Sequence, residues 1–288
     1  MLTPPESAGA PLPGVAASPE EGLVRLRALM RGCERVVVAY SGGVDSSLVL
    51  QVAFAELRQD CLAVTARSPT MANAEYEAAI KVAADIGAPH ETITLNELEN
   101  ADFVANLPDR CFHCKDGLYR RLTALAAERG YHAVLDGTNL DDLAGHRPGY
   151  RAIQLHGVRA PLVEAGLTKS AIRILSRQLG LPTADKPSSP CLSSRVPFGT
   201  PIDVGVLRMI EDAETGLRGL GFGELRVRHH GSVARIEIPP ESFARLLELR
   251  CEAVAAVRAA GYQFVALDLV GLRSGSLSEG LGPPTRRG

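Results

Sequence analysis

Residues 35–47 read RVVVAYSGGVDSS, and this stretch decides the fold. RVVVAY (35–40) is a short β-branched run without a polar interruption, a pattern typical of a parallel strand buried on both faces. SGGVDSS (41–47) follows directly and leads into SLVLQVAFAELR (47–58), an apolar-rich helical stretch. Strand, glycine turn and helix in this order predict a site where backbone N–H groups and a helix N-terminus hold a phosphate.

The same strand pattern recurs on the C-terminal side of this unit. It is found in CLAVTA (61–66), HETITL (90–95) and HAVLDG (132–137), with helical stretches near 72–86 and 115–129 between them. Further helices are predicted from Ser18 to about Arg31 and from Thr168 to Leu179. This alternation predicts the α/β class with a doubly wound parallel sheet. Its ligands are expected beyond the carboxyl ends of the strands.

A length of 288 residues suits one large and one small domain. Residues 181–201 contain five prolines and mark the predicted boundary. The expected organisation is a disordered tail (1–17), the α/β domain (18–180), an interdomain loop that carries Cys191 (181–201), a smaller α+β domain of order α-β-β-α-β (202–272) and a second disordered tail (273–288).

Composition and charge disfavour several classes of protein. With 31 Lys+Arg against 33 Asp+Glu, the net charge of −2 creates no positive field for a nucleic acid. The N-terminal residues lack a basic region followed by an apolar run, so no secretion signal is predicted. No apolar run reaches the roughly 18 residues of a membrane span. A cytoplasmic protein is expected, in which six cysteines serve as thiols, metal ligands or core residues and not as disulfides.

The phosphate loop has a specific signature. Gly42 and Gly43 let the backbone approach an anion, and Ser41, Ser46 and Ser47 supply hydroxyl groups. A GK[ST] sequence is missing, so this is not the mononucleotide P-loop. SGGVDSS resembles instead the SGGxDS signature of the PP-loop ATP-pyrophosphatases (HUP-like fold). The resemblance implies ATP as cofactor, release of pyrophosphate, and Asp45 near the magnesium ion. The alternative is a glycine-rich turn without a ligand.

A second motif, DGTNLDDLAGHRPG (136–149), follows the fourth strand and is therefore expected at the same edge of the sheet. Asp136, Asp141 and Asp142 can attract Mg²⁺, and Arg147 can hold a phosphate or a carboxylate through a bidentate contact. The alternative is an Asp/Asn-rich turn that satisfies its own backbone. The predicted nucleotide site includes from this motif Asp136, Gly137, Thr138 and Arg147.

Three cysteines form a third candidate site. Cys111 and Cys114 lie in RCFHCK at the predicted start of a helix, and Cys191 lies in SSPCLSSR. Three thiolates suit a [4Fe-4S] cluster with one open iron. Zinc with His113 or another histidine as fourth ligand and a redox dithiol are the alternatives. The remaining cysteines, Cys33, Cys61 and Cys251, are predicted to be inert core thiols.

SGGVDSS, RCFHCK, DGTNLDDLAGHRPG and PCLSSRVPFGTPI occur in this order. Together they resemble the ATP-dependent sulfur transferases that mature the nickel-pincer cofactor of lactate racemase (the LarE family), from about residue 20 to 272. The resemblance implies that a carboxylate of pyridinium-3,5-biscarboxylic acid mononucleotide is adenylated and that sulfur then displaces AMP. The product is a thiocarboxylate.

The family resemblance also implies a sulfur source. In one version a lone cysteine at the position of Cys191 gives up its own sulfur. In the other, two further cysteines join it to hold a [4Fe-4S] cluster, and sulfide is the nucleophile. All three cysteines are present here, so the cluster version is expected, with Cys191 and Asp45 as catalytic residues. A sulfide donor, cofactor-pathway proteins and a second copy of the chain in a homo-oligomer are the expected partners.

The C-terminal part contributes candidate anion-binding residues. Arg226 and Arg228 alternate with apolar residues and point to the same face of a strand. The family resemblance implies that such arginines contact the substrate, and Arg195 of the PCLSSR motif is placed in the same site. The alternative is that Arg226 and Arg228 lie on a solvated face of the strand without a ligand. Glu211 and Glu214 are candidate metal ligands, with a solvated helix surface as the alternative, and His229 and His230 remain without a role.

Three other functions stay open at this point. Several PP-loop enzymes thiolate tRNA, but they would need a basic RNA-binding module. An ammonia-using PP-loop synthetase would leave the three cysteines idle. A regulatory ATP-binding module with a zinc site would release no pyrophosphate.

Overall fold

The computed structural model describes residues 14–143, 148–273 and 276. The chain forms two compact units. The first consists of the residues up to Thr65 together with Ala78–Ile93 and Tyr119–Lys186. The second consists of Ala66–Glu77, Thr94–Leu118 and the residues from Pro187 onward. The residues around Cys111, Cys114 and Cys191 therefore belong to one unit, although they are distant in the sequence.

A four-stranded sheet forms the centre of the first unit. Its order is β3-β2-β1-β4, and β1 (Val36–Ala39) pairs in parallel with β2 (Cys61–Arg67) and β4 (Ala133–Leu135). Strand β3 (His90–Thr94) lies at one edge of the sheet and β4 at the other. All residues of β1 are buried, as its uninterrupted apolar run predicts.

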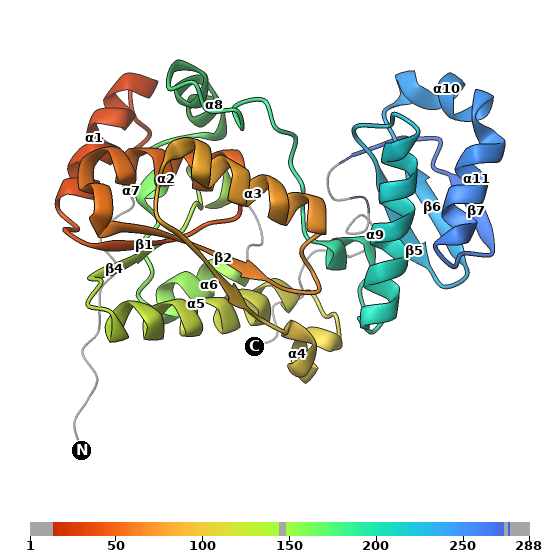
Figure 1. The fold of residues 1–288 in the computed structure, drawn as a ribbon, viewed down its shortest axis with the longest axis horizontal. Coiled ribbons are helices and arrows are strands. Elements are labelled where there is room, and N and C mark those ends of the chain that lie inside the picture. Colours follow the sequence, from red (N-terminus) through yellow and green to blue (C-terminus); the bar gives the residue numbers. More distant parts are fainter. Residues whose placement is uncertain (1–13, 144–147, 274–275, 277–288) are drawn as a thin grey trace. The chain divides into compact units, whose positions relative to one another are not determined.

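Helices cover both faces of this sheet, so the predicted doubly wound α/β class is confirmed. Figure 1 shows α2 (Val44–Leu57) and α3 (Asn73–Ile86) on one face and α5 (Arg110–Glu128) and α6 (Pro148–Leu155) on the other. The remaining helices of the first unit are α1 (Pro19–Arg31), α7 (Pro161–Glu164) and α8 (Lys169–Gln178). As predicted, α1 begins at Ser18, whose hydroxyl accepts a hydrogen bond from Glu21 N.

Helix α5 begins at Arg110, earlier than the residue 115 that the sequence predicts. Pro108 and Asp109 precede it, and both residue types favour the start of a helix. Cys111 and Cys114 are consequently the second and fifth residues of α5, in its first two turns. They are three residues apart, a spacing that places them on neighbouring positions of one helix face.

The second unit contains an α+β module. Helix α9 (Val204–Gly219) begins at Asp203, whose carboxylate accepts a hydrogen bond from Val206 N. A three-stranded sheet of order β5-β6-β7 follows, with β5 and β6 antiparallel and β6 and β7 parallel. The fourth predicted element is split into two helices. The bounds are β5 (Arg226–His230), β6 (Val233–Glu237), α10 (Phe243–Glu248), α11 (Arg250–Ala259) and β7 (Phe264–Leu267).

A separate apolar cluster in the second unit holds the segment that follows Cys191. Leu192, Val196 and Ile202 of this segment are buried together with Phe103 from α4 (Ala101–Val104) and Leu207 from α9. Cys191 itself immediately precedes the 3₁₀ helix Leu192–Arg195. Burial of these neighbouring residues therefore fixes the position of the backbone at Cys191.

In the described part of the chain, no helix combines the length and the apolar character needed to cross a membrane.

Candidate active site

The phosphate loop Ser41–Ser47 connects β1 to α2. Gly42 has a φ of 71°, and a Cβ atom on it would lie 2.6 Å from the Cβ of Ala79. Glycine is therefore required there for both conformation and space. Gly43 precedes the first residue of α2 and forms its N-terminal cap position. The loop thus has the backbone that lets an anion approach the N-terminus of a helix.

The serine hydroxyls of the loop are close to one another. Ser41 Oγ lies 3.1 Å from Ser46 Oγ, and Ser46 Oγ donates to the Gly43 carbonyl at 3.3 Å. The fully buried Ser47 has its Oγ 3.5 Å from the hydroxyl oxygen of Tyr40. The structure therefore gathers the hydroxyl groups that the sequence predicts as phosphate ligands.

The second motif packs directly on this loop. A Cβ atom on Gly137 would lie 2.9 Å from the backbone nitrogen of Ser46, so only glycine allows this approach. The carboxylate of Asp136 accepts hydrogen bonds from Tyr119 Oη at 2.7 Å and Thr138 N at 2.8 Å, and Thr138 Oγ1 contacts it as well. Asp136 therefore stabilises the turn that leads to Thr138. Arg147 lies outside the described residues.

Asp45 lies at the start of α2 and has two partners that the sequence did not reveal. Asn139 Nδ2 donates to Asp45 Oδ1 at 3.2 Å, and Lys169 Nζ forms an ion pair with Oδ2. Burial raises the pKa of Asp45 above its ordinary value, while the hydrogen bond and charge of Lys169 act in the opposite direction. The negative charge of Asp142 raises this pKa as well.

A second lysine reaches the loop from a later part of the chain. Lys186 Nζ donates to the carbonyl of Gly42 at 3.1 Å. Arg173 of α8 holds the backbone before it, with hydrogen bonds to the carbonyls of Ala184 and Lys186. Neither lysine forms a motif with the loop in the sequence, so no local pattern could have distinguished them from the other basic residues.

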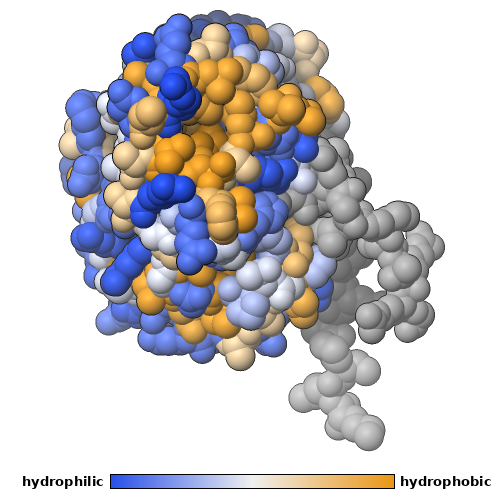
Figure 2. Space-filling model, turned by 90° about the vertical axis from the view of Figure 1, so that its right-hand side faces the viewer, coloured by the Kyte–Doolittle hydropathy of each residue, from blue (hydrophilic) through white to orange (hydrophobic). Residues whose placement is uncertain are grey.

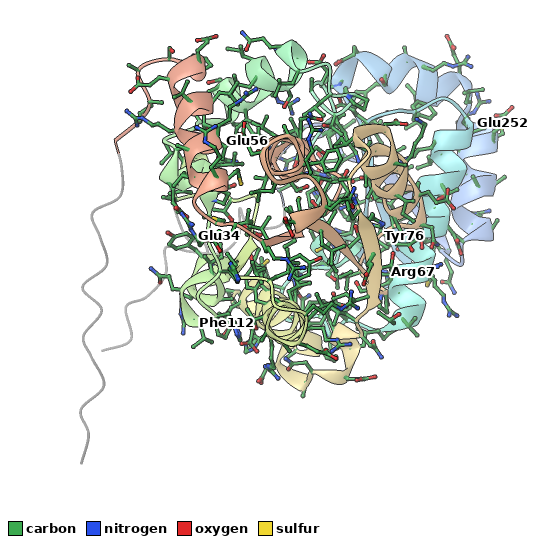
Figure 3. All side chains as sticks on the ribbon, turned by 60° about the vertical axis from the view of Figure 1, so that its left-hand side comes forward. Glu34, Glu56, Arg67, Tyr76, Phe112 and Glu252 are labelled. Carbon is green, nitrogen blue, oxygen red and sulfur yellow. The ribbon has the colours of Figure 1, made fainter. Side chains whose placement is uncertain are left out.

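The three cysteines are free thiols, and Cys191 contributes to a raised pKa of both Cys111 and Cys114. Burial raises the pKa of the Cys114 thiol well above its ordinary value, and the acidic groups of Glu97 and Cys191 raise it further. The pKa of Cys111 is raised because surrounding protein desolvates its thiol, although the residue keeps exposed surface, and Cys191 adds to this rise. Figure 3 labels Phe112, which stands between the two cysteines of α5.

A short chain of hydrogen bonds joins the two cysteine segments. Cys114 Sγ lies 3.8 Å from Glu97 Oε1, which also accepts a hydrogen bond from Thr70 Oγ1 at 3.2 Å. The carbonyl of Thr70 in turn accepts from Leu192 N at 2.8 Å, next to Cys191. Glu97 and Thr70 are further residues of this site that the sequence analysis did not identify.

Thiols are the type of ligand that holds a metal–sulfur group. Two buried polar atoms at this site lack a hydrogen-bond partner in the described structure, Glu97 Oε2 and Ser193 Oγ. Within the described ranges, however, no group of three or more His, Cys, Asp or Glu side chains is close enough to hold a metal ion. Cys111 and Cys191 are exposed, so their side chains have room to turn toward Cys114. His113 instead pairs with Asp109, at 3.4 Å.

Arg195 and Arg228 are buried in ion pairs. Arg195 Nε lies 2.9 Å from Glu214 Oε1, and Arg195 Nη1 donates to the carbonyl of Cys191 at 3.1 Å. Arg228 Nη2 lies 2.8 Å from Glu237 Oε2. Glu214 is 1% exposed, so a solvated surface position is wrong for this residue. These contacts connect the cysteine segment to the sheet of the second unit.

Arg226 has a different environment. Its Nη1 donates to the carbonyl of Arg273 at 3.0 Å. Burial lowers the pKa of Arg226, and the positive charges of Arg228 and Arg195 lower it further. The three predicted arginines are thus brought within electrostatic reach of one another, and a negatively charged ligand would relieve their repulsion.

Glu211 and His229 lie in structural contacts. Glu211 accepts a hydrogen bond from Asn73 N at 2.6 Å. His229 is buried, with Nδ1 3.2 Å from the hydroxyl oxygen of Tyr262.

At the carboxyl end of β2, the Arg67 guanidinium lies 4.9 Å from the ring centroid of Tyr76, and Figure 3 shows these two side chains together.

Comparisons with known proteins agree with this geometry. The asparagine synthase family matches residues 25–187, the part that contains the phosphate loop and the second motif. A tRNA-specific 2-thiouridylase of Xanthobacter autotrophicus is 32% identical, but over only 54% of this chain and 49% of its own.

Two relatives are similar over nearly the whole chain. An uncharacterized protein of Synechocystis sp. is 42% identical over 90% of this chain and 97% of its own. The pyridinium-3,5-bisthiocarboxylic acid mononucleotide synthase of Lactiplantibacillus plantarum is 37% identical over 89% of this chain and 93% of its own. With its phosphate loop and second motif in contact, this chain belongs to the LarE family of ATP-dependent sulfur transferases, within the PP-loop ATP-pyrophosphatases.

Proposed function

We propose that this enzyme adenylates the carboxylates of pyridinium-3,5-biscarboxylic acid mononucleotide and converts them to thiocarboxylates. The observation that carries the proposal is the presence of three neighbouring thiols in a chain that also has a PP-loop. The name of the Lactiplantibacillus plantarum relative supports the choice of substrate.

The first step activates a poor electrophile. A carboxylate oxygen attacks the α-phosphorus of ATP, a bond to AMP forms, and the bond to pyrophosphate breaks. The amides of Gly42 and Gly43 and the N-terminus of α2 would hold the phosphates. Lys169 and Lys186 lie at this loop and would neutralise the charge that grows on pyrophosphate. Mg²⁺, held by Asp45 and its acidic neighbours, would add to this neutralisation.

The second step replaces AMP by sulfur. Cys111, Cys114 and Cys191 would hold a [4Fe-4S] cluster, which supplies an exchangeable sulfur when bound. Arg195 holds the carbonyl of Cys191 and is itself held by Glu214, so the chain positions this cysteine firmly. In the product a C–S bond has formed, and AMP leaves with the former carboxylate oxygen.

The arginines of the second unit would bind the substrate phosphate. Ion pairs join five guanidinium groups to three carboxylates, those of Glu214, Glu237 and Asp268, and a sixth arginine, Arg226, lies within electrostatic reach of both groups of ion pairs. Positive charge is therefore in excess among these residues, and a phosphate would balance part of it. The six arginines are Arg195, Arg218, Arg226, Arg228, Arg235 and Arg273.

Product analysis tests the proposed reaction. With ATP, Mg²⁺ and the mononucleotide, we expect AMP and pyrophosphate, and Asp45→Ala should abolish turnover while the protein stays folded. A loop residue at the ligand edge contributes little to the core. ADP and orthophosphate as the substrate-dependent products would contradict the proposal. So would a fully active Asp45→Ala variant.

The alternative functions give different results in the same assays. A tRNA thiolase would retain bulk tRNA in a filter-binding assay, and an ammonia-using synthetase would form an amide without sulfide. A regulatory module would release no pyrophosphate. The cytoplasmic location, the sulfide donor, the pathway proteins and the homo-oligomer stay predictions.

A further inference from the structure

Asn106 holds the segment after Cys191 against the residues that precede α5. It is fully buried and has a φ of 54°, in the left-handed region. Its Nδ2 donates to the carbonyls of Pro197 and Thr200, each at 2.8 Å, and its own carbonyl accepts from Gly199 N at 3.0 Å. One side chain therefore organises a turn that lies far from it in the sequence.

Arg110 connects this arrangement to the cysteines. It is 5% exposed, and its Nη1 donates to Asn106 Oδ1 at 2.5 Å and to the carbonyl of Ser193 at 2.9 Å. The guanidinium carbon lies 5.4 Å from the centroid of the Phe198 ring. Arg110 thus contacts the Cys191 segment through two different residues, while it directly precedes Cys111 in α5.

The charge of Arg110 has an unusual environment. Among the residues that the structure describes, no carboxylate forms an ion pair with Arg110, and its side chain donates instead to the neutral oxygens of Asn106 and Ser193. A buried cation is costly unless an anion compensates it. The residue that follows Arg110 in α5 is Cys111, whose thiol becomes an anion when it binds a metal.

We propose that Arg110 is the positioning residue of the three-cysteine site and supplies its counter-charge. Through Asn106 and Ser193 it holds the Cys191 segment beside the first turn of α5. Its positive charge balances the thiolates of Cys111, Cys114 and Cys191 once they carry a metal–sulfur group. This inference rests on the proposed function for the identity of that group, but the positioning role holds for the metal-free protein as well.

Cross-linking tests the positioning role without any metal. Dibromobimane joins two thiols that lie close together, and peptide mapping locates the bridge. In reduced, metal-free wild type we expect a bridge from Cys191 to Cys111 or Cys114. In Arg110→Gln its yield should fall about tenfold, because a charge-assisted hydrogen bond that holds the segment is lost. Arg121→Gln, the same exchange at an exposed position of α5, should keep the wild-type yield.

Iron loading tests the counter-charge. After anaerobic reconstitution, Arg110→Gln should bind iron roughly 10–100-fold more weakly than wild type, the usual cost of losing a partner of a metal ligand. Its reduction potential should be lower, because a nearby positive charge favours the reduced, more negative state. Arg110→Lys keeps the charge and should keep the potential near that of wild type. Arg110→Lys also replaces Arg110→Gln as the test variant if thermal unfolding shows that Arg110→Gln does not fold.

The outcomes separate the two proposals. Equal cross-linking yields in wild type and folded Arg110 variants would overturn the positioning role, and equal potentials in wild type and Arg110→Gln would overturn the counter-charge. If wild type takes up no iron, the cluster of the proposed function is wrong. The cross-linking result then still decides whether Arg110 positions the cysteines.

Discussion

At the scale of single residues, the contact between Lys169 and Asp45 brings a positive charge to the phosphate loop that the motif itself does not contain. We expect Lys169→Met to lower kcat about 100-fold or more, since this charge would stabilise the pyrophosphate that forms in the transition state. Lys81→Met is the control, because Lys81 is exposed and pairs with the nearby Asp85. A steady-state assay for pyrophosphate compares them, and equal kcat values would remove Lys169 from the site.

The fate of Cys191 distinguishes two sources of sulfur. With iron, sulfide and reductant present, we expect several turnovers per chain and an intact Cys191 afterwards. A thiolate that is bound to iron is a weaker nucleophile than a free sulfide, so sulfur should come from solution. Mass spectrometry of the peptide with Cys191 measures this.

Variants of the other two cysteines complete the test. Cys111→Ala and Cys114→Ala should lose multiple turnover. Cys251→Ala should not, because Cys251 is exposed on α11 and the prediction that it is a core thiol is wrong. Conversion of Cys191 to dehydroalanine in wild type, in equal amount to product, would show that the cysteine sacrifices its own sulfur.

At the scale of elements, strand β5 makes the stability of the protein depend on pH. Burial lowers the pKa of His229 below its ordinary value of 6.5, and burial together with Arg235 lowers that of His230. The unfolded chain therefore binds more protons than the folded one as pH falls below about 6.5, and the free energy of unfolding decreases. Above this pH both histidines are neutral in either state, so their effect disappears.

Urea unfolding on both sides of this pH checks the expectation. His229→Gln should reduce the loss of stability at the lower pH, and its amide can still pair with the Tyr262 hydroxyl. The same pH dependence in His229→Gln and wild type would contradict the assignment.

The elements also show what a sequence can predict. β1, the phosphate loop and α2 are contiguous, so a local pattern contains all the information for them. The approach of Cys191 to α5 depends instead on contacts across 76 intervening residues after Cys114 and on the left-handed backbone of Asn106. Lys169, Lys186 and Glu97 likewise act through tertiary contacts. No spacing rule identifies such residues, because their contacts form only when distant parts of the chain fold together.

At the scale of the whole molecule, exposed apolar residues gather on the C-terminal part, as Figure 2 shows. Phe264, Leu269 and Val270 belong to β7 and the turn after it, and Leu269 is 81% exposed. Exposed apolar groups of this kind often mark contacts between proteins. We expect sedimentation analysis to give a mass above that of one chain, and Leu269→Lys with Val270→Lys to lower it. A wild-type protein that sediments as a monomer at all concentrations would contradict the predicted homo-oligomer.

The paired hydroxyls of Ser41 and Ser46 have a thermodynamic consequence for nucleotide binding. The two hydroxyl groups already hydrogen-bond to each other, and Ser46 also donates to the Gly43 carbonyl. A phosphate that enters the loop therefore replaces these hydrogen bonds and does not add new ones. Each exchange changes the enthalpy little, because one hydrogen bond is broken for each one formed. The heat released on mixing with ATP should therefore be small. The affinity then depends on ionic attraction to the two lysines, and raising the salt concentration should weaken it.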